Sequence, residues 1–529
     1  MTLPDPHNPY SFNEFLQWRE NVDYWADDPF LQKVAAFYSG DMFDAVDARA
    51  REVSAKASRR WRRFAEKASR PENRPYVEHF DGHGNRVDKI VRPMEVTTME
   101  REVFSLGLFS RSTPRWVRLV SMYLVYENGE ACISCPLVCT EGLVEILDRF
   151  ADRPETRDIL DHCREGRNGE FGIGAQFLSE IQGGSDVPAN LVEAVPGENG
   201  AYRLYGDKFF CSAVHADYAL VTAKPRGSEK VALFVVPAYL PGEEKRNGHV
   251  INRIKWKMGT AELPTAEITY DGAVAWPVGP LDRGLANVVG IVLALSRLTV
   301  GLSAGAGMAR GAREARAYAN FRTAFGLPVA RFPLAAGQLD QLDLAANRTT
   351  AGSFKVYSGF LDLPDGLKGG LVTDEPPEAA RKRFRVRELV MLQKITASWD
   401  AVDSARLAMS LFGGHGVMED FSDLPRLYRD GAVNELWEGP RNVLLTQIHR
   451  DLTRAASWYP PRELVADLLS GADEQVVKEL SEEIMDYAAL PHLFTMDEET
   501  KQACKNWDSF CHRLFHAYQD LALAEVEGS

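Results

Sequence analysis

The chain has 529 residues, of which 45% are apolar and 26% are charged, and this balance excludes a largely disordered protein. Its 61 Lys and Arg residues are outnumbered by 75 Asp and Glu residues, so the net charge is −14 and a polyanion is disfavoured as the main partner. Seven cysteines and an N-terminus without a basic, apolar leader indicate a cytoplasmic protein with reduced thiols. The longest apolar stretch, 285–295, is too short to span a bilayer, so we expect no membrane insertion.

Residues 1–171 are predicted to be mainly helical, as an N-terminal extension over 1–90 and a helical domain over 91–171. Within 41–70, apolar residues recur at three- or four-residue spacing and form one face: Val53, Ala57, Trp61, Phe64 and Ala68. Nine Lys or Arg residues surround this face against two Glu, which indicates either a solvated helix face or a surface for phosphates or a partner subunit. Residues 76–90 are predicted to be a short hairpin or loop.

The remaining chain divides into three parts. Short apolar runs punctuated by Gly, Pro, Asn and Asp predict a β-sandwich or barrel over 172–280. Residues 281–450 are predicted to be a helical bundle, in which 287–320 form one long helix rich in Ala and Gly. An acidic helical extension follows over 451–529, with sixteen Asp or Glu against six Lys or Arg. The predicted fold class is therefore α+β, with helical regions on both sides of a β domain.

Five short strings stand out for their chemistry. In the first, Gln176 to Asp186, paired glycines precede Ser185, so that backbone N–H groups and a hydroxyl can approach an anion. Alone it is an ordinary turn between strands, and it matches neither the Walker loop nor GxGxxG. The others are 206–212, which pairs aromatic residues with a serine, 322–326, 412–416 and 428–442.

Together, and in this order, the five strings resemble the acyl-CoA dehydrogenase family over about residues 90–450. Phe177 to Asp186 is similar to the family's first signature, and Lys257-Met258-Gly259 to the β-domain segment that closes its flavin site. Within the family the chain is most similar to the AidB-type branch, because of the Gln-Gly-Gly-Ser-Asp and Trp-Glu-Gly forms and the extensions at both ends.

The resemblance implies that Glu438 removes the proton α to the carbonyl of a CoA thioester. An apolar wall at Trp437 would raise its pKa, as a general base requires. Read without the resemblance, Glu438 is a first-turn acid at a helix N-terminus. The position that carries an alternative base in some branches is Ser296, which favours Glu438, and Arg297 either positions the substrate or forms a helix ion pair.

The resemblance also implies FAD as cofactor, held by residues carried over one at a time. Those expected at the flavin half are Leu178, Ser179, Gly184, Ser185, Phe210 and Ser212. Those expected to reach the FAD of a neighbouring subunit are Arg322, Phe325, Gly413 and Gly414, and Asn442 also meets the cofactor. The chain departs from the family pattern at Ser410, Ala324, Phe332-Pro333 and Pro440, and these departures concern the adenosine half of the site.

Two further groups are assigned no active-site role. Cys132, Cys135 and Cys139 have spacings that suit metal thiolates, but a fourth ligand is lacking and they lie in an apolar helical run, so we expect no metal there. His215 and Asp217 follow the second string, 206–212, and are interpreted as surface strand residues.

The leading function is α,β-dehydrogenation of an acyl-CoA, with an electron-transferring flavoprotein as acceptor and a homo-oligomer, expected to be a tetramer. The main alternative is an AidB-type stress flavoprotein that binds DNA, which the acidic C-terminus disfavours. A flavin-bearing subunit without turnover is a third reading, which an intact Glu438 disfavours.

Overall fold

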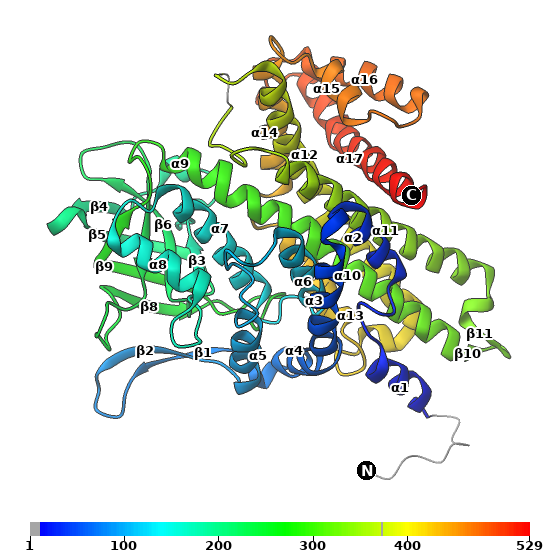
Figure 1. Cartoon of the computed structure of the whole chain (residues 1–529), viewed down its shortest axis with the longest axis horizontal. Coiled ribbons are helices and arrows are strands. Elements are labelled where there is room, and N and C mark those ends of the chain that lie inside the picture. Colours follow the sequence, from blue (N-terminus) through cyan, green and yellow to red (C-terminus); the bar gives the residue numbers. More distant parts are fainter. Residues whose placement is uncertain (1–10, 372–373) are drawn as a thin grey trace.

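The computed structural model describes residues 11–371 and 374–529, so the N-terminus, where we expected no leader, lies outside the described residues. Figure 1 shows a β domain at one side of the molecule, long helices running across it, and a second group of helices at the C-terminal end. The expected order of helical, β and helical regions is confirmed.

The N-terminal region is helical apart from one hairpin. Its helices are α1 (Asn13–Asn21), α2 (Pro29–Ser39), α3 (Phe43–Lys56), α4 (Arg62–Ala68), α5 (Met94–Phe104), α6 (Arg115–Tyr126), α7 (Ser134–Phe150) and α8 (Pro154–Glu165). The hairpin predicted between 76 and 90 is formed by β1 (Tyr76–Phe80) and β2 (Arg86–Val91). The predicted apolar face of α3 and α4 is buried, with Val53, Ala57 and Trp61 fully inaccessible.

The middle region is a closed β-barrel. Its strands are β3 (Gly174–Phe177), β4 (Glu193–Pro196), β5 (Tyr202–Ser212), β6 (Tyr218–Pro225), β7 (Ala232–Pro237), β8 (His249–Ile254) and β9 (Thr265–Pro277). They follow the order β3-β6-β4-β5-β9-β7, and the additional pairing of β6 with β7 closes the ring. Closure leaves the alternating inward side chains as a core of their own, separate from the core of the helices.

The C-terminal bundle contains the long helix predicted from the sequence. It follows the short turns α9 (Gly284–Asn287) and Val288–Val292 as α10 (Leu293–Phe321), and it packs against α11 (Pro333–Leu361) and α12 (Pro377–Phe412). A Cβ on Gly301 would lie 2.2 Å from Gln393 of α12, so the close approach of the two helices requires glycine there. The helix from Gly284 to Phe321 is long and apolar enough to cross a membrane, but 78% of its apolar window is buried inside the protein.

The bundle ends with two elements that frame the candidate site. Helix α13 (Leu424–Asn434) and helix α14 (Arg441–Ala455) are joined by a loop, 435–440. At the other end of α10 lies a short hairpin that leads into α11. Its strands, β10 (Thr323–Ala324) and β11 (Leu327–Pro328), have two residues each.

The acidic extension forms α15 (Pro461–Leu468), α16 (Glu474–Ala488) and α17 (Glu498–Glu527). Helix α17 packs against α11, α12 and α2, and it buries Trp507, Phe510 and Phe515. Figure 1 shows α17 running back along the bundle, so that the C-terminus lies beside N-terminal helices. The extension is therefore an integral part of the fold, and its boundaries, like the other domain boundaries, stay predictions.

The surface placement predicted for His215 is wrong. Its side chain is 5% exposed, and its Nε2 lies 2.8 Å from Glu100 Oε2, which Arg92 also contacts at 2.6 Å. The pair joins the barrel to α5. Cys132 also differs from expectation, because it precedes α7 and its thiol contacts Arg92, whereas the sulfurs of Cys135 and Cys139 lie 3.8 Å apart within α7.

Candidate active site

A pocket opens between α7, α10, α12 and α13. Counting its mouth and the solvent there, it contains about 840 Å³ of empty space. Its deeper wall is apolar, with Tyr126, Val138, Val300, Ala304 and Leu427 among its lining residues. Small residues face it from α10 and α12, among them Ser296, Ser303, Ala304, Ala401 and Ala405.

Glu438 lies on the wall of this pocket, in the loop between α13 and α14. Its backbone is held in a left-handed conformation, with a φ of 59°, which is costly for a residue other than glycine. Arg297 Nε donates to the carbonyl oxygen of Glu438 at 2.8 Å. Lys394 Nζ donates to the carbonyl oxygens of Glu435 and Gly439 at 2.9 and 2.8 Å. Two buried cations therefore hold the backbone of the loop.

The carboxylate of Glu438 is left free by this arrangement. Its Oε2 is buried and has no hydrogen-bond partner in the part of the chain that the structure describes. Burial raises the pKa of Glu438 to about 7, although the nearby Arg297 and Lys394 act in the opposite direction. Burial also lowers the pKa of Lys394 to about 7. A carboxyl group with this pKa can accept a proton at neutral pH and release it again.

The structure does not bring Arg297 to the pocket, so substrate positioning by this residue is not supported. Its guanidinium lies behind the loop, whereas its neighbour Ser296 lines the pocket. The alternative reading as a helix ion pair is also incomplete, because the hydrogen bond is to a backbone carbonyl. Arg297 fixes the strained conformation of Glu438.

A cluster of buried acids at the same pocket was missed by sequence reasoning. Glu130 and Asp430 line the pocket, and Glu262 lies behind them. Burial, together with the charges of the other two acids, raises the pKa of Glu130 to about 8. Glu262 accepts a hydrogen bond from the backbone N–H of Ala131, and Asp430 accepts one from the backbone N–H of Thr260. Both donor residues have a positive φ. The only local signal was a Gly-Glu pair after α6, because the three acids lie more than 100 residues apart.

Hydrogen bonds among Lys257 and three hydroxyl groups connect the barrel to the loop that contacts this cluster. Lys257 Nζ donates to Thr260 Oγ1 at 2.9 Å and to Thr265 Oγ1 at 2.8 Å, and Thr265 Oγ1 lies 3.0 Å from Ser212 Oγ. A Cβ on Gly259 would lie 2.1 Å from the carbonyl oxygen of Arg429. The loop around Lys257, which the sequence connected with the flavin site, therefore packs directly on α13.

The first two strings are brought together as one surface. Lys208 and Glu180 form a buried ion pair of 2.8 Å, and Lys208 Nζ also donates to the carbonyl oxygen of Leu178 at 3.0 Å. The backbone N–H of Phe209 donates to Ser179 O at 2.9 Å. Next to this pair, a Cβ on Gly184 would lie 2.6 Å from Ser179 Oγ, so the close approach depends on glycine. Ser185 is exposed, and Phe210 is 52% exposed beside the ammonium group of Lys255.

Unsatisfied polar atoms belong to Gln176 of β3 and to Trp437, which packs against the barrel core. Both amide atoms of Gln176 and the indole Nε1 of Trp437 are buried without a partner among the described residues. Buried polar groups are normally hydrogen-bonded, so each such atom needs an explanation. An exposed aromatic face, a glycine cradle and unpaired polar atoms fit a large planar cofactor with polar edges.

The remaining predicted contacts lie elsewhere. Arg322 and Phe325 are at the far end of α10, roughly 37 Å along the helix from Arg297. Gly413 and Gly414 are at the same end, because Tyr318 OH hydrogen-bonds His415 Nδ1 at 2.8 Å. Figure 1 shows β10 and β11 on the opposite side of the molecule from the barrel. Asn442 is exposed at the first turn of α14, near Glu438.

Comparison with known families covers most of the chain. Residues 16–158 match the adaptive response protein AidB N-terminal domain, 175–273 the acyl-CoA dehydrogenase middle domain, and 282–453 the acyl-CoA dehydrogenase C-terminal domain. The chain belongs to the acyl-CoA dehydrogenase family. The match to the AidB N-terminal domain confirms the predicted similarity to the AidB-type branch.

Two curated relatives are similar over much of the chain. One is acyl-CoA dehydrogenase family member 11 of Caenorhabditis elegans, 29% identical over 395 residues, which are 71% of this chain and 62% of the relative. This alignment spans less than two thirds of the relative's length. The other is the putative acyl-CoA dehydrogenase AidB of Escherichia coli K12, 27% identical over 76% of this chain and 72% of the relative.

Solved structures share the acyl-CoA dehydrogenase fold over nearly the whole chain. The apo form of Bd2924 has a TM-score of 0.84 at 24% identity and covers 96% of this chain and 99% of its own. The C. elegans ACDH-11 in complex with C11-CoA has a TM-score of 0.78 at 24% identity, with coverages of 99% and 91%. An acyl-CoA dehydrogenase of Bacillus anthracis, complexed with FAD, has a TM-score of 0.68 at 17% identity, with coverages of 97% and 85%.

Proposed function

We propose that the protein is an FAD-dependent dehydrogenase of CoA thioesters in which Glu438 is the catalytic base. One observation carries this proposal. The carboxylate of Glu438 lies on the wall of an apolar pocket with an unpartnered oxygen, and its pKa is raised by burial to about 7. A group that must take a proton from a weak carbon acid needs these properties together.

The residues around the pocket have different roles in the proposed reaction. The acyl chain lies among Val138, Val300 and Ala304, which exclude water from the reacting carbons. Glu438 removes the proton from the carbon α to the thioester carbonyl. Arg297 and Lys394 keep the carboxylate in place through the backbone, without a direct ion pair that would lower its basicity. Bound FAD supplies the acceptor for the hydride that leaves the β carbon.

The flavin half of FAD is proposed to lie against the surface formed by the first two strings. Ser179, Gly184 and Ser185 offer hydroxyl and backbone N–H donors, Phe210 an aromatic face, and Ser212 a further hydroxyl. The unpaired amide of Gln176 adds a donor and an acceptor that the sequence reading did not include.

We further propose that the adenosine half is bound by a second copy of the chain. Arg322, Phe325, Gly413 and Gly414 lie roughly 37 Å from the catalytic loop along α10, too far to complete the same cofactor site. Phe325 is 98% exposed, and a Cβ on Gly413 or Gly414 would meet no atom within 4 Å. A homotetramer remains the expected assembly, and an electron-transferring flavoprotein the expected electron acceptor.

A DNA-binding role is less well supported. The basic stretch between 49 and 70 is largely neutralised by acids of other segments, such as Glu20 near Arg62 and Arg63, Glu95 near Lys67 and Glu102 near Arg60. Phosphate groups would have to compete with these pairs. The stretch therefore corresponds best to the solvated helix face that the sequence also allowed.

Anaerobic mixing with a series of straight-chain acyl-CoA thioesters tests the proposed function. We expect the flavin absorbance to bleach with at least one thioester and not with the corresponding free acid. If no thioester of the series reduced the flavin of the FAD-loaded protein, the proposed reaction would be wrong.

A further inference from the structure

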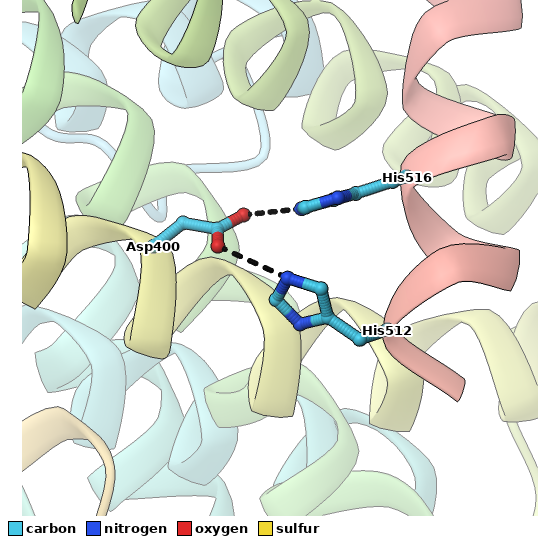
Figure 2. A group of neighbouring side chains, drawn as sticks. All are labelled: Asp400, His512 and His516. Atoms are coloured by element: carbon cyan, nitrogen blue, oxygen red, sulfur yellow. Dashed lines mark hydrogen bonds and ion pairs between the residues drawn. The ribbon is translucent and has the colours of Figure 1, made fainter. Parts of the chain in front are cut away.

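Two histidines of the C-terminal extension face one carboxylate of the catalytic bundle. His512 and His516 are one helical turn apart on α17, and Asp400 lies opposite them on α12 (Figure 2). Asp400 Oδ2 is 2.7 Å from His516 Nε2, and Asp400 Oδ1 is 3.4 Å from His512 Nε2. One ligand atom from each residue can be chosen so that all three lie within 4.8 Å of one another.

The hydrogen bonds inside this group, the Asp400 cluster, are incomplete. His512 Nδ1 is buried without a partner among the described residues, and its Nε2 is at the outer limit of a hydrogen bond to Asp400. His516 Nε2 is contacted both by Asp400 and, at 2.9 Å, by Arg348 Nη2. A single ring nitrogen cannot donate to the carboxylate and accept from the guanidinium at the same time.

We propose that Asp400, His512 and His516 form a binding site for a divalent transition-metal ion of the Zn²⁺ or Co²⁺ type. Two imidazole nitrogens and a carboxylate oxygen are the donor set that these ions prefer, whereas Mg²⁺ and Ca²⁺ prefer oxygen ligands alone. Histidines four residues apart on one helix present their rings on the same face, as chelation requires.

One ligand separation already suits tetrahedral coordination, whereas His516 Nε2, at 2.7 Å from Asp400 Oδ2, would have to move outward by a few tenths of an ångström. Bonds of about 2.0–2.1 Å separate tetrahedral ligand atoms by about 3.4 Å. His512 Nε2 and Asp400 Oδ1 already have this separation.

The site is open to solvent, and a nearby acid can bind the guanidinium group of Arg348 when a metal ion takes its place. Asp400 and Arg348 both lie on the wall of an open groove between α11 and α12, which contains about 1030 Å³ including its mouth. Asp520 is 3.9 Å from Arg348 Nη1 and can keep the guanidinium away from the metal. Water from the groove would supply the fourth ligand.

A metal ion here would fasten the extension to the wall of the active-site pocket. Ala401, the residue after Asp400, lines that pocket. Arg441 lies three residues after Glu438. Its Nε donates to both carboxylate oxygens of Asp508 on α17, at 2.8 and 3.0 Å. The Asp400 cluster therefore connects α17 to the helices that hold the loop with Glu438.

Titration of untagged, chelator-treated full-length protein with ZnCl₂ by calorimetry tests the proposal. We expect one Zn²⁺ per chain and a rise in Tm on adding Zn²⁺. His512→Gln and His516→Gln should each weaken binding by more than about 100-fold. Arg348→Gln should strengthen it, because a competing cation is removed. Co²⁺ should give the visible absorption of a tetrahedral complex in the wild type and not in either histidine variant.

The matched control is His83→Gln, which changes an exposed histidine at the tip of the β1–β2 hairpin and should bind Zn²⁺ as the wild type does. Flavin content and far-UV circular dichroism of each variant show whether it is folded. Absence of saturable binding to the wild type below roughly 1 mM Zn²⁺ would overturn the proposal. Equal affinity of the wild type and the folded histidine variants would also overturn it. Neither result depends on the proposed dehydrogenase reaction.

Discussion

The two ends of helix α10 differ in how completely the rest of the chain covers and contacts them. At the end of α10 near Arg297, here called the closed end, Arg297 is buried and donates to the backbone of the loop 435–440, which carries the proposed base. At the open end, Phe325 projects from the β10–β11 hairpin with 98% of its surface exposed and a φ of 50°. Phe325 and Gly326 form the turn between β10 and β11, which requires a positive φ at both residues, while the ring of Phe325 projects into solvent.

The strained backbone at each end of α10 is supported in a different way. The positive φ of Glu438 is maintained by hydrogen bonds from Arg297 and Lys394 within the chain. The positive φ of Phe325 is maintained by the pairing of Ala324 with Leu327, and its ring makes an edge-to-face contact with Phe332 at 6.4 Å. We therefore expect changes at the closed end to affect chemistry, and changes at the open end to affect assembly and cofactor affinity.

The largest effect is expected from Glu438→Gln, at the closed end. The amide keeps the volume of the side chain and removes the base, so flavin reduction by acyl-CoA should be at least about a hundredfold slower. Flavin binding should survive, because the residues proposed to hold the ring do not include Glu438. Anaerobic stopped-flow spectroscopy measures the rate.

The matched control for this variant is Glu435→Gln, in the same loop and only partly buried. It should reduce its flavin within a few-fold of the wild type. A wild-type rate for Glu438→Gln, together with a slow Glu435→Gln, would move the base to Glu435.

The pH dependence of flavin reduction sharpens the same assignment. Because burial raises the pKa of Glu438 to about 7, the carboxylate form is populated above that pH and lost below it. The rate should therefore fall about tenfold per pH unit below pH 7 and level off above it. Glu438→Gln should lack this dependence. A wild-type rate that is constant from about pH 5 to pH 7 would contradict the raised pKa.

At the open end, Phe325→Asp is expected to weaken assembly. Asp tolerates a positive φ better than Phe, so the hairpin should keep its shape while its apolar contact is lost. Light scattering should show a smaller species, and FAD affinity should fall about tenfold or more. Met496→Asp, which changes another exposed apolar residue, should leave both unchanged. A variant that keeps its size and its FAD affinity would mean that the open end faces solvent.

The order of the regions was predictable because each has its own local pattern. Gly, Pro and Asn punctuation marks the barrel strands, and three- to four-residue apolar spacing marks helices such as the one that buries Trp61. The closed end was predictable in part, since the segment with Trp437 and Glu438 is a short contiguous string. The supporting roles of Arg297 and Lys394 were not, because both act on backbone atoms more than 40 residues away.

Clusters assembled from distant segments escaped sequence analysis. Glu130, Glu262 and Asp430 meet only after the barrel docks on the bundle. His215 was assigned to the surface because its partner, Glu100, lies 115 residues away. His215 lies in the turn after β5, where no periodic pattern marks a side chain as buried.

The smallest effect is expected where the extension supports the closed end, at Asp508→Asn. Arg441 begins α14 directly after the catalytic loop, and it donates both to Asp508 and, through Nη1, to the carbonyl oxygen of Ile395 at 2.6 Å. The carboxylate of Asp508 is 41% exposed, so the loss of one ion pair should cost little and the bond to Ile395 should remain. We expect flavin reduction to slow by about two- to fivefold, with unchanged size and FAD affinity. Asp520→Asn, on the same helix but away from the loop, should have no effect on the rate. An Asp508→Asn variant that instead loses FAD or dissociates would show that the extension serves the open end, and the division between the two ends of α10 would not hold.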